Sequence, residues 1–273
     1  MDKKSKGGTL YFVIFVVILV YLLPFLFMVF VSFKPVGSPM GSGLLRTGGF
    51  TLANYLDVFS SGLYTRYLVN GLVVAISTAL LAIIIGFFSS YALSRFRFPF
   101  KEKLFIGMIA IKAMPPVLMC IAFFSFAVNT KMYDTLWILI ILDTIFNVPL
   151  SIIMLRNFID AIPKELDEAA QLDGCAQGKY LLKVILPLTR SGIAAIFVQC
   201  FLLSWNEYMY AVLFINGNKF KMPTVAIYDF IGQWSTNYIG IVTFAVLLSL
   251  PVIIAFIAVQ KHFVKGMLAG SEK

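Results

Sequence analysis

The sequence predicts an all-α membrane protein with six transmembrane helices, and three observations support this fold class. First, 60% of the 273 residues are hydrophobic and the mean hydropathy is +0.91. Second, 13% of the residues are charged, about half the share found in a typical soluble domain. Third, the chain holds several uncharged apolar runs of about 20 residues, the length that crosses the hydrocarbon core of a bilayer. We therefore expect a single membrane domain over residues 1–273.

Six apolar runs are long enough to cross a membrane. The first follows the basic segment MDKKSKGGTL and is longer than the apolar core of a secretory signal, so we expect an uncleaved first span. The second holds Ala82, Gly86 and Ser90 at steps of four residues, a stripe that lets helix backbones approach closely in lipid. Prolines fall in or near several runs, where neighbouring helices can satisfy the freed carbonyl groups. The predicted spans cover roughly residues 11–33, 67–94, 104–126, 136–155, 191–213 and 238–260.

The loop charges predict that both termini are cytoplasmic. With the N-terminus inside, 15 of the 22 Lys and Arg residues fall in inner segments, six in outer segments, and Lys112 within a span. Cytoplasmic loops are enriched in these residues, which accounts for the net charge of +9 without nucleic-acid binding. In the first outer loop, FTLANYLDVFSSGLYTRYL predicts a short amphipathic helix that either lies on the bilayer or docks a partner from outside.

The chain lacks the patterns of common enzyme and metal sites. Cys120, Cys175 and Cys200 are far apart and show no CxxC spacing, and His262 is the one histidine. The sequence therefore offers neither a disulfide framework nor a Cys/His metal site. It contains no HExxH or GxSxG motif, and GCAQGKY has neither the spacing nor the hydroxyl residue of a GxxxxGK[ST] phosphate loop. We expect that the chain is not an enzyme and that any ATP hydrolysis occurs in another subunit.

One long polar stretch, residues 163–188, interrupts the apolar chain within a predicted cytoplasmic loop of about residues 156–190. Pro163 suits the first turn of a helix, and Glu165, Asp167 and Glu168 follow where the helix dipole favours negative charge. Gly174 suits the end of that helix, because glycine accepts the left-handed conformation. KYLLKVILPL then predicts a second cytoplasmic helix. The first helix presents one small, shallow face, made by Leu166, Ala169, Ala170 and Asp173.

From local chemistry alone, an ordinary helical loop explains this stretch equally well, but its residues resemble a known motif. Glu168-Ala169-Ala170, Gly174 and Leu186-Pro187 have the spacing of the EAA loop of ABC importer permeases, with Val184 where that motif usually has isoleucine. Other segments are similar to the carbohydrate-uptake branch of that family: SFKP, NYLDVF, YALSRFRF, LRNFIDAIPKELDEAAQLDG, WNEYMYAVLF and QKHFVKGMLAG. Over nearly its whole length, the chain resembles the smaller six-span permease of maltose-type systems.

This resemblance implies a type I ABC importer permease (MetI-like) fold in a multi-pass protein of the cytoplasmic (inner) cell membrane. It implies import of a sugar or oligosaccharide, with a solute such as glycerol phosphate as the alternative; an ion-coupled secondary transporter is a further alternative. The implied partners are a second homologous permease, a cytosolic ABC ATPase dimer that binds ATP and Mg, and an extracytoplasmic solute-binding protein. No cofactor is implied in this chain. The residues implied to couple to the ATPase are Glu165, Glu168, Ala169, Ala170, Asp173, Gly174, Leu186 and Pro187.

Three ionisable residues, Lys112, Asp143 and Glu207, fall within predicted spans, where such residues usually face the bundle interior or a wet cavity. Lys112 and Asp143 lie at similar heights, which predicts either an ion pair between two spans or a position on the solute path. SWNEY in the fifth span combines an aromatic ring with polar groups that suit a sugar, and in the resembled family this region borders the translocation cavity. The predicted path residues are Asp143, Asn147, Ser204, Trp205, Asn206, Glu207 and Tyr208.

Overall fold

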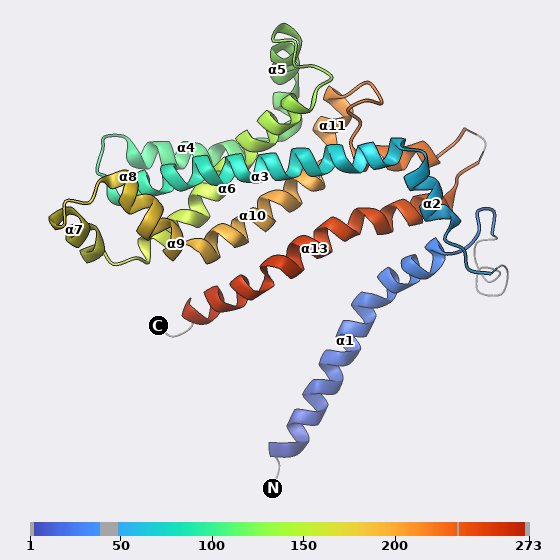
Figure 1. The fold of residues 1–273 in the computed structure, drawn as a ribbon, viewed down its shortest axis with the longest axis horizontal. Coiled ribbons are helices and arrows are strands. Elements are labelled where there is room, and N and C mark those ends of the chain that lie inside the picture. The colour runs from blue at the N-terminus through green and yellow to red at the C-terminus, as the bar shows by residue number, and fades with distance from the viewer. Residues whose placement is uncertain (1–2, 39–48, 234, 271–273) are drawn as a thin grey trace. The chain divides into compact units, whose positions relative to one another are not determined.

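The computed structural model describes residues 3–38, 49–233 and 235–270, with side chains for 10–38, 49–233 and 235–260, and it is mostly helical. Contacts within the chain define two units, which are residues 1–65 with 226–251 and residues 66–225 with 252–273. Two long helices contribute to both units: α3, Leu63–Arg95, and α13, Tyr238–Gly270. Figure 1 shows the course of the chain through these elements.

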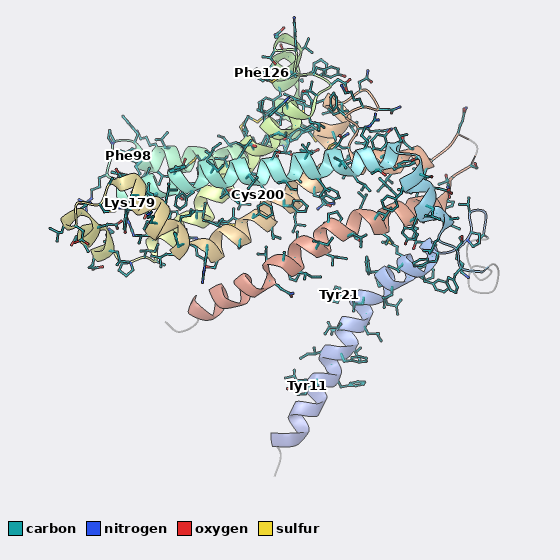
Figure 2. The ribbon with its side chains drawn as sticks, in the orientation of Figure 1. Tyr11, Tyr21, Phe98, Phe126, Lys179 and Cys200 are labelled. Carbon is teal, nitrogen blue, oxygen red and sulfur yellow. The ribbon has the colours of Figure 1, made fainter. Side chains whose placement is uncertain are left out.

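The first unit begins with α1, Lys3–Ser32, followed by the short helix α2, Ala53–Ser60. Over residues 10–24 of α1, side chains on all sides are exposed within this chain, and Tyr11 and Tyr21 project from the helix (Figure 2). The Asn54 amide on α2 donates hydrogen bonds of 2.8 Å to the carbonyl oxygens of Ser32 and Lys34, which ties α2 to the end of α1. A short helix is therefore present in the stretch predicted for the first outer loop, but it ends at Ser60, and the last part of that stretch begins α3 at Leu63.

Aromatic packing joins the remaining parts of the first unit. Tyr64 at the start of α3 stacks on Phe230 of the 3-10 turn η2, Ile227–Phe230, with ring centroids 5.0 Å apart. Phe244 on α13 lies 5.4 Å from the Tyr64 ring and 5.8 Å from the Phe230 ring. These contacts bring together segments from both ends of the sequence.

The second unit contains the rest of the helices. Helix α6, Leu136–Asp160, runs through it and contacts α4, α10 and α11. The elements other than α3, α6 and α13 are α4 Lys101–Ala113, α5 Pro116–Asn129, α7 Glu165–Leu172, α8 Gln177–Tyr180, the π-helical turn η1 Leu181–Ile185, α9 Leu186–Leu188, α10 Arg190–Trp205, α11 Met209–Phe214 and α12 Pro223–Ala226. In Figure 1, α7, α8 and α9 lie together at one end of this group.

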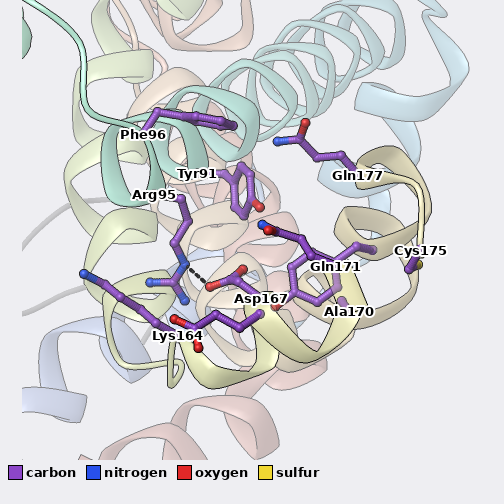
Figure 3. A pocket seen from close by; sticks show the side chains of 11 residues that line it. Tyr91, Arg95, Phe96, Lys164, Asp167, Ala170, Gln171, Cys175 and Gln177 are labelled. Carbon is purple, nitrogen blue, oxygen red and sulfur yellow. Dashed lines mark ion pairs between the residues drawn. The ribbon is translucent and has the colours of Figure 1, made fainter. Parts of the chain in front are cut away.

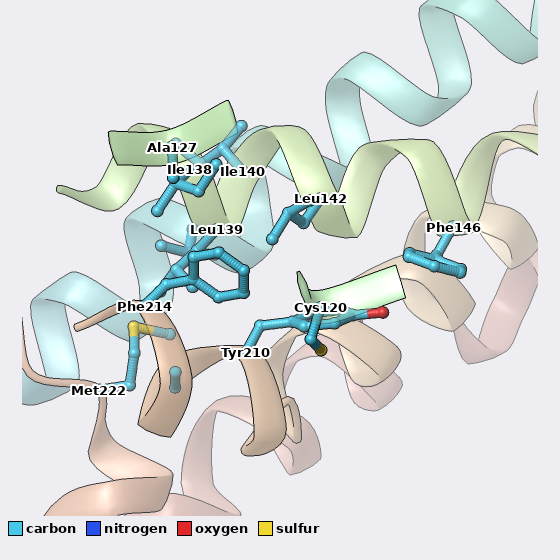
Figure 4. Close-up of a cluster of buried hydrophobic side chains, with 12 residues drawn as sticks. Cys120, Ala127, Ile138, Leu139, Ile140, Leu142, Phe146, Tyr210, Phe214 and Met222 are labelled. Carbon is cyan, nitrogen blue, oxygen red and sulfur yellow. The ribbon is translucent and has the colours of Figure 1, made fainter. Parts of the chain in front are cut away.

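A buried hydrophobic cluster holds α3, α5, α6 and α11 together (Figure 4). Phe146 on α6 stacks on Tyr210 of α11, with ring centroids 5.7 Å apart. Phe214, one turn further along α11, is fully buried. Lipid is as apolar as these side chains, so shape and van der Waals contact rather than water exclusion must hold such helices together.

The small-residue stripe of α3 packs as predicted. Ala82, Gly86 and Ser90 are all buried. A Cβ atom placed on Gly86 would lie 2.7 Å from the Cβ of Ser151 on α6. The absence of a side chain at Gly86 therefore sets how closely α3 and α6 approach.

Among the residues that the structure describes, four helical segments are long and apolar enough to cross a membrane: Leu10–Ser32, Leu63–Arg95, Leu136–Asp160 and Tyr238–Gln260. They agree with the first, second, fourth and sixth predicted spans. Two bent helix pairs, Lys101–Ala113 with Pro116–Asn129 and Gln177–Leu188 with Arg190–Trp205, bring the count to six if each pair is one span.

The predicted span over residues 104–126 is not one straight helix, because the chain bends by 97° between α4 and α5. Met114 and Pro115 are both extended at the bend, with ψ angles of 132° and 121°. Proline has no N–H for a helical hydrogen bond, and it drives the preceding residue out of the helical region. The pair Pro115-Pro116 therefore ends α4 and starts α5 in a new direction, and α5 turns away from α4 in Figure 1.

The fifth predicted span, residues 191–213, is also interrupted. Helix α10 ends at Trp205 and α11 begins at Met209. No proline lies between them, and the break is stabilised by polar side chains described below.

Candidate functional site

The polar stretch folds as a short, exposed helix with defined ends. The carbonyl oxygen of Lys164 accepts backbone hydrogen bonds from Asp167 at 2.9 Å and Glu168 at 3.2 Å, which starts α7 directly after Pro163. Three acidic residues occupy the first turn, where the positive end of the helix dipole stabilises them. The predicted helix start is therefore confirmed.

Gly174 ends α7 in the way the sequence predicts. Its φ angle is +65°, in the left-handed region. The Gly174 N–H bonds the carbonyl oxygen of Gln171 at 3.0 Å, and the Cys175 N–H bonds that of Ala170 at 2.9 Å. This pair of bonds is a Schellman motif, which satisfies the last carbonyl groups of a helix.

Most of α7 is open to a partner. None of its residues is buried, and Leu172 at its end is 90% exposed. The residues predicted to couple to an ATPase lie on this helix and on the helical run that follows. Within that set, Glu165, Glu168, Ala169, Asp173, Gly174 and Pro187 are exposed, while Ala170 and Leu186 are half-buried.

The opposite face of α7 borders a pocket of about 430 Å³ at the end of α3 (Figure 3). Asp167 points into the pocket, and its carboxylate lies 2.7 Å from Nε of Arg95, the last residue of α3. Burial of the Tyr180 phenol, together with the negative charge of Asp167, raises the pKa of Tyr180 above its ordinary value. The pocket is lined by Tyr91, Arg95, Phe96, Lys164, Asp167, Glu168, Ala170, Gln171, Cys175, Gln177 and Tyr180.

Sequence reasoning missed the pairing of Arg95 with Asp167. From the sequence, Arg95 was interpreted as one of the basic residues of an inner loop, and Asp167 as an acidic residue that the helix dipole stabilises. The two residues lie far apart in the sequence, and neither belongs to a local pattern that points to the other. The two residues carry opposite charges and both fall in predicted cytoplasmic segments, and this was the signal that could have suggested their pairing.

A second group of predicted residues lies between α6 and α10. The Ser204 hydroxyl donates a hydrogen bond to the carboxylate of Asp143. The Asn147 amide donates to the backbone carbonyl of Asp143 at 2.8 Å, and Ser151 lies 3.3 Å from the sulfur of Cys200. These residues follow steps of four on both helices, so they form a polar seam along the helix contact.

This seam corrects the predicted ion pair between Lys112 and Asp143. The Asp143 side chain is 4% exposed and faces α10, whereas Lys112 is exposed on α4. Similar predicted heights in the membrane do not pair the two groups, because the Asp143 carboxylate is buried against Ser204 while Lys112 is exposed. Among the described side chains, Asp143 takes Ser204 as its partner and forms no ion pair with Lys112.

Trp205 was predicted to line the solute path, but its side chain is buried. Its side chain is 2% exposed, and its ring stacks on Phe201 with centroids 5.9 Å apart. A Cβ atom on Gly71 of α3 would approach the Trp205 ring to 2.9 Å. The indole is therefore enclosed by protein in this chain and does not present an open aromatic face.

The last three predicted path residues, Asn206, Glu207 and Tyr208, lie in the break between α10 and α11. Glu207 is half-buried, and its carboxylate accepts hydrogen bonds from the backbone N–H groups of Tyr210 at 3.0 Å and Ala211 at 3.3 Å. It thus caps the start of α11. The neighbouring Asn206 and Tyr208 side chains are exposed, so of the seven predicted path residues these two are the ones open to solute or to a partner chain.

Within the described residues, no group of three His, Cys, Asp or Glu side chains is placed to hold a metal ion.

Comparison with known proteins gives concordant matches. A family model described as "Binding-protein-dependent transport system inner membrane component" matches residues 82–269. The inner membrane ABC transporter permease protein YcjP of Escherichia coli is 30% identical, over 94% of this chain and 92% of that protein. The melibiose/raffinose/stachyose import permease protein MelC of Bacillus subtilis is 28% identical, over 93% and 92%. The trehalose transport system permease protein SugB of Mycobacterium tuberculosis is 29% identical, over 92% of each chain.

Solved structures share the fold. One chain of a bacterial ABC transporter involved in the import of the acidic polysaccharide alginate superposes with a TM-score of 0.78 at 20% identity, over 96% of this chain and 98% of that one. A chain of the MetNI methionine ABC transporter gives a TM-score of 0.59 at 18% identity, over 74% and 95%.

Proposed function

Because the chain belongs to the family of binding-protein-dependent transport system inner membrane components, we propose that it is the permease subunit through which an ABC importer moves sugar into the cell. It has the type I, MetI-like fold of that family, and its apolar helices suit a multi-pass protein of the cell membrane. The observation that carries the proposal is α7, a short helix on which Glu168 and Ala169 of the EAA motif are exposed and whose end is fixed by Gly174.

The proposed solute is a sugar or an oligosaccharide. Relatives that match more than 90% of this chain are named for the import of melibiose, raffinose, stachyose and trehalose. Exposed Asn206 and Tyr208, in the break between α10 and α11, offer an amide and an aromatic ring, the two groups that suit the polar rim and the apolar face of a sugar. A solute such as glycerol phosphate is the alternative within the same function.

The energy for transport comes from a separate ATPase dimer that binds ATP and Mg, because the chain has no phosphate-binding loop. The exposed face of α7 docks on this ATPase, and the other proposed partners are a second homologous permease and an extracytoplasmic solute-binding protein. Side chains of α1 over residues 10–24 are exposed on all sides in this chain, which is consistent with additional surfaces being covered by lipid or by the second permease.

The proposed topology has six spans, with both termini and α7 in the cytoplasm. The four long helical segments, the bent pair of α4 and α5, and α10 with α11 supply the spans. An even number of spans places both termini on the same side, and the excess of Lys and Arg in the segments on that side identifies it as cytoplasmic. All spans then belong to one permease domain.

Purification of the tagged chain from native membranes in mild detergent tests the function. We expect a second permease and a soluble ATPase to co-purify, and the eluate to hydrolyse ATP. Reconstituted with its binding protein, the complex should take up one sugar from a panel of melibiose, raffinose and trehalose. A chain that elutes alone, without ATPase activity, and transports solute under a proton gradient would instead be an ion-coupled secondary transporter.

A further inference from the structure

Arg95 links the end of α3 to the coupling helix. Its guanidinium lies 2.7 Å from the carboxylate of Asp167 on α7, and the two side chains are 7% and 14% exposed. Arg95 also donates a hydrogen bond of 2.8 Å to the carbonyl oxygen of Ile162, in the link that precedes α7. The adjacent Ser94 donates to Asp160 at the end of α6. Two neighbouring residues of α3 therefore hold the end of α6, the link and α7.

The Arg95–Asp167 pair differs from the ion pair between Arg156 and Asp160 nearby. That second pair lies within α6, spans 3.4 Å and has side chains that are 23% and 47% exposed. An exposed pair within one helix contributes little to stability. A largely buried pair between two elements is different, because removal of either partner leaves an uncompensated charge away from water.

The other groups around Asp167 cannot replace Arg95. Tyr180 faces the carboxylate, but its raised pKa keeps the phenol protonated and neutral. Tyr91 is a second phenol on the pocket wall (Figure 3). Lys164 lines the same pocket but is exposed to solvent. Arg95 is thus the buried cation that balances Asp167 on this side of α7.

Packing alone does not fix α7 against α3. No residue of α7 is buried, and the pocket of about 430 Å³ lies between the helix and the end of α3. A motor that pushes on the exposed face of α7 could therefore move it into this space unless a directional contact holds it. The ion pair provides that contact.

We infer that Arg95 is a positioning residue of the coupling helix: its ion pair with Asp167 makes α7 move as one body with α3. This inference rests on the proposed function and deepens it. Helix α3 runs from Leu63 to Arg95, and its buried face meets α6 at Gly86 and the Trp205 ring at Gly71. Movement imposed on α7 would in this way reach both the polar seam and the break after α10.

The test uses the complete purified complex in lipid nanodiscs, with spin labels at exposed positions Leu172 on α7 and Phe88 on α3. Arg95→Glu and Asp167→Arg should each broaden the distance distribution between the labels and lower the ATPase rate of the complex about tenfold or more. The double variant with the two charges exchanged should restore both. Arg156→Gln is the matched control and should leave both unchanged.

A second pair of variants distinguishes loss of the ion pair from a general loss of folding. Arg95→Lys keeps the positive charge and should retain most of the ATPase rate, whereas Arg95→Gln should not. If Arg95→Lys and Arg95→Gln are equally impaired and the charge exchange restores nothing, the inference is overturned. It is also overturned if the single reversals leave the distance unchanged. If the wild-type complex itself shows no ATPase activity, that result contradicts the proposed function instead.

Discussion

The carboxylate of Asp143 on α6 accepts a hydrogen bond from the hydroxyl of Ser204 on α10, and both side chains are buried. The contact lies within a seam that continues through Asn147, Ser151 and Cys200. Polar contacts between spans stabilise helix association, because the alternative is an unsatisfied group in hydrocarbon. Asp143 thus has a structural partner in this chain, which accounts for an acidic residue at this depth without solute contact.

We expect Ser204→Ala to destabilise the protein by about 1–3 kcal/mol, because it leaves a buried acceptor without its donor. Thermal unfolding of the purified protein in detergent measures the change. Ser125→Ala, which removes an exposed hydroxyl from α5, is the control and should lie within about 0.5 kcal/mol of wild type.

A double-variant cycle with Asp143→Asn separates this contact from others. If Ser204 and Asp143 act through each other, their effects on stability should not add. Additive effects, or a Ser204→Ala protein as stable as wild type, would contradict a structural role for the pair and would return Asp143 to the solute path.

Gly86→Ala should weaken the packing of α3 against α6. The added Cβ would lie 2.7 Å from the Cβ of Ser151 and 3.4 Å from its carbonyl carbon, so the backbones must separate. Overpacking of this kind costs about 1–3 kcal/mol. Gly107→Ala on α4 is the matched control, since a Cβ there meets nothing within 4 Å and should be neutral or stabilising. Melting temperatures of the two variants in the same detergent decide the matter, and equal values would refute close packing at Gly86.

Gly174→Ala should loosen the end of α7. A Cβ at this position meets nothing within 4 Å, so the cost arises from the φ angle of +65° alone. The left-handed conformation costs a residue other than glycine about 1–2 kcal/mol. We expect Gly174→Ala and Gly174→Asp to lower sugar uptake more than ATP hydrolysis, because the helix is displaced rather than removed.

Gly174→Asn is the informative control, because asparagine tolerates the left-handed region better than alanine. It should retain more uptake per ATP than Gly174→Ala.

Glu168→Lys, which reverses an exposed charge in the first turn of α7, should reduce recovery of the ATPase with the tagged chain. Unchanged transport in both Gly174→Asp and Glu168→Lys would exclude α7 as the coupling element.

The sequence predicted the apolar helices and the ends of α7 because both depend on local properties. Run length identifies a span, and Pro163 and Gly174 set helix ends through their own backbone preferences. The bend at Pro115 was not predicted, since a proline inside an apolar run is compatible with a straight or a broken span. The neighbours of Asp143, Arg95 and Trp205 could not be predicted either, because they depend on which faces of distant helices meet.

Tyr208→Ala should weaken solute recognition without unfolding the protein. The Tyr208 ring is 41% exposed, so its removal leaves no large cavity in the core. We expect a higher solute concentration for half-maximal uptake and an unchanged melting temperature. Trp205→Ala provides the contrast, because removing a fully buried indole costs about 3–5 kcal/mol and should destabilise the chain first. If Tyr208→Ala leaves uptake unaltered for every sugar transported, this face does not belong to the solute path.

Glu207 distinguishes a helix cap from a solute contact. Its carboxylate accepts two backbone N–H groups at the start of α11, and its own carbonyl oxygen accepts a 2.7 Å hydrogen bond from Thr224. Loss of a capping side chain costs about 0.5–2 kcal/mol. Glu207→Ala should therefore lower the melting temperature. Glu207→Gln keeps one acceptor oxygen and should be intermediate in stability, with uptake within about threefold of wild type, since a factor of three is less than 1 kcal/mol.

The opposite pattern would assign Glu207 to the solute. In that case Glu207→Gln would abolish uptake while the melting temperature stayed at the wild-type value, because the charge rather than the cap would be the property that matters. Uptake assays and unfolding curves on the same preparations separate the two roles. Our structure favours the cap, since both carboxylate oxygens already accept backbone hydrogen bonds within this chain.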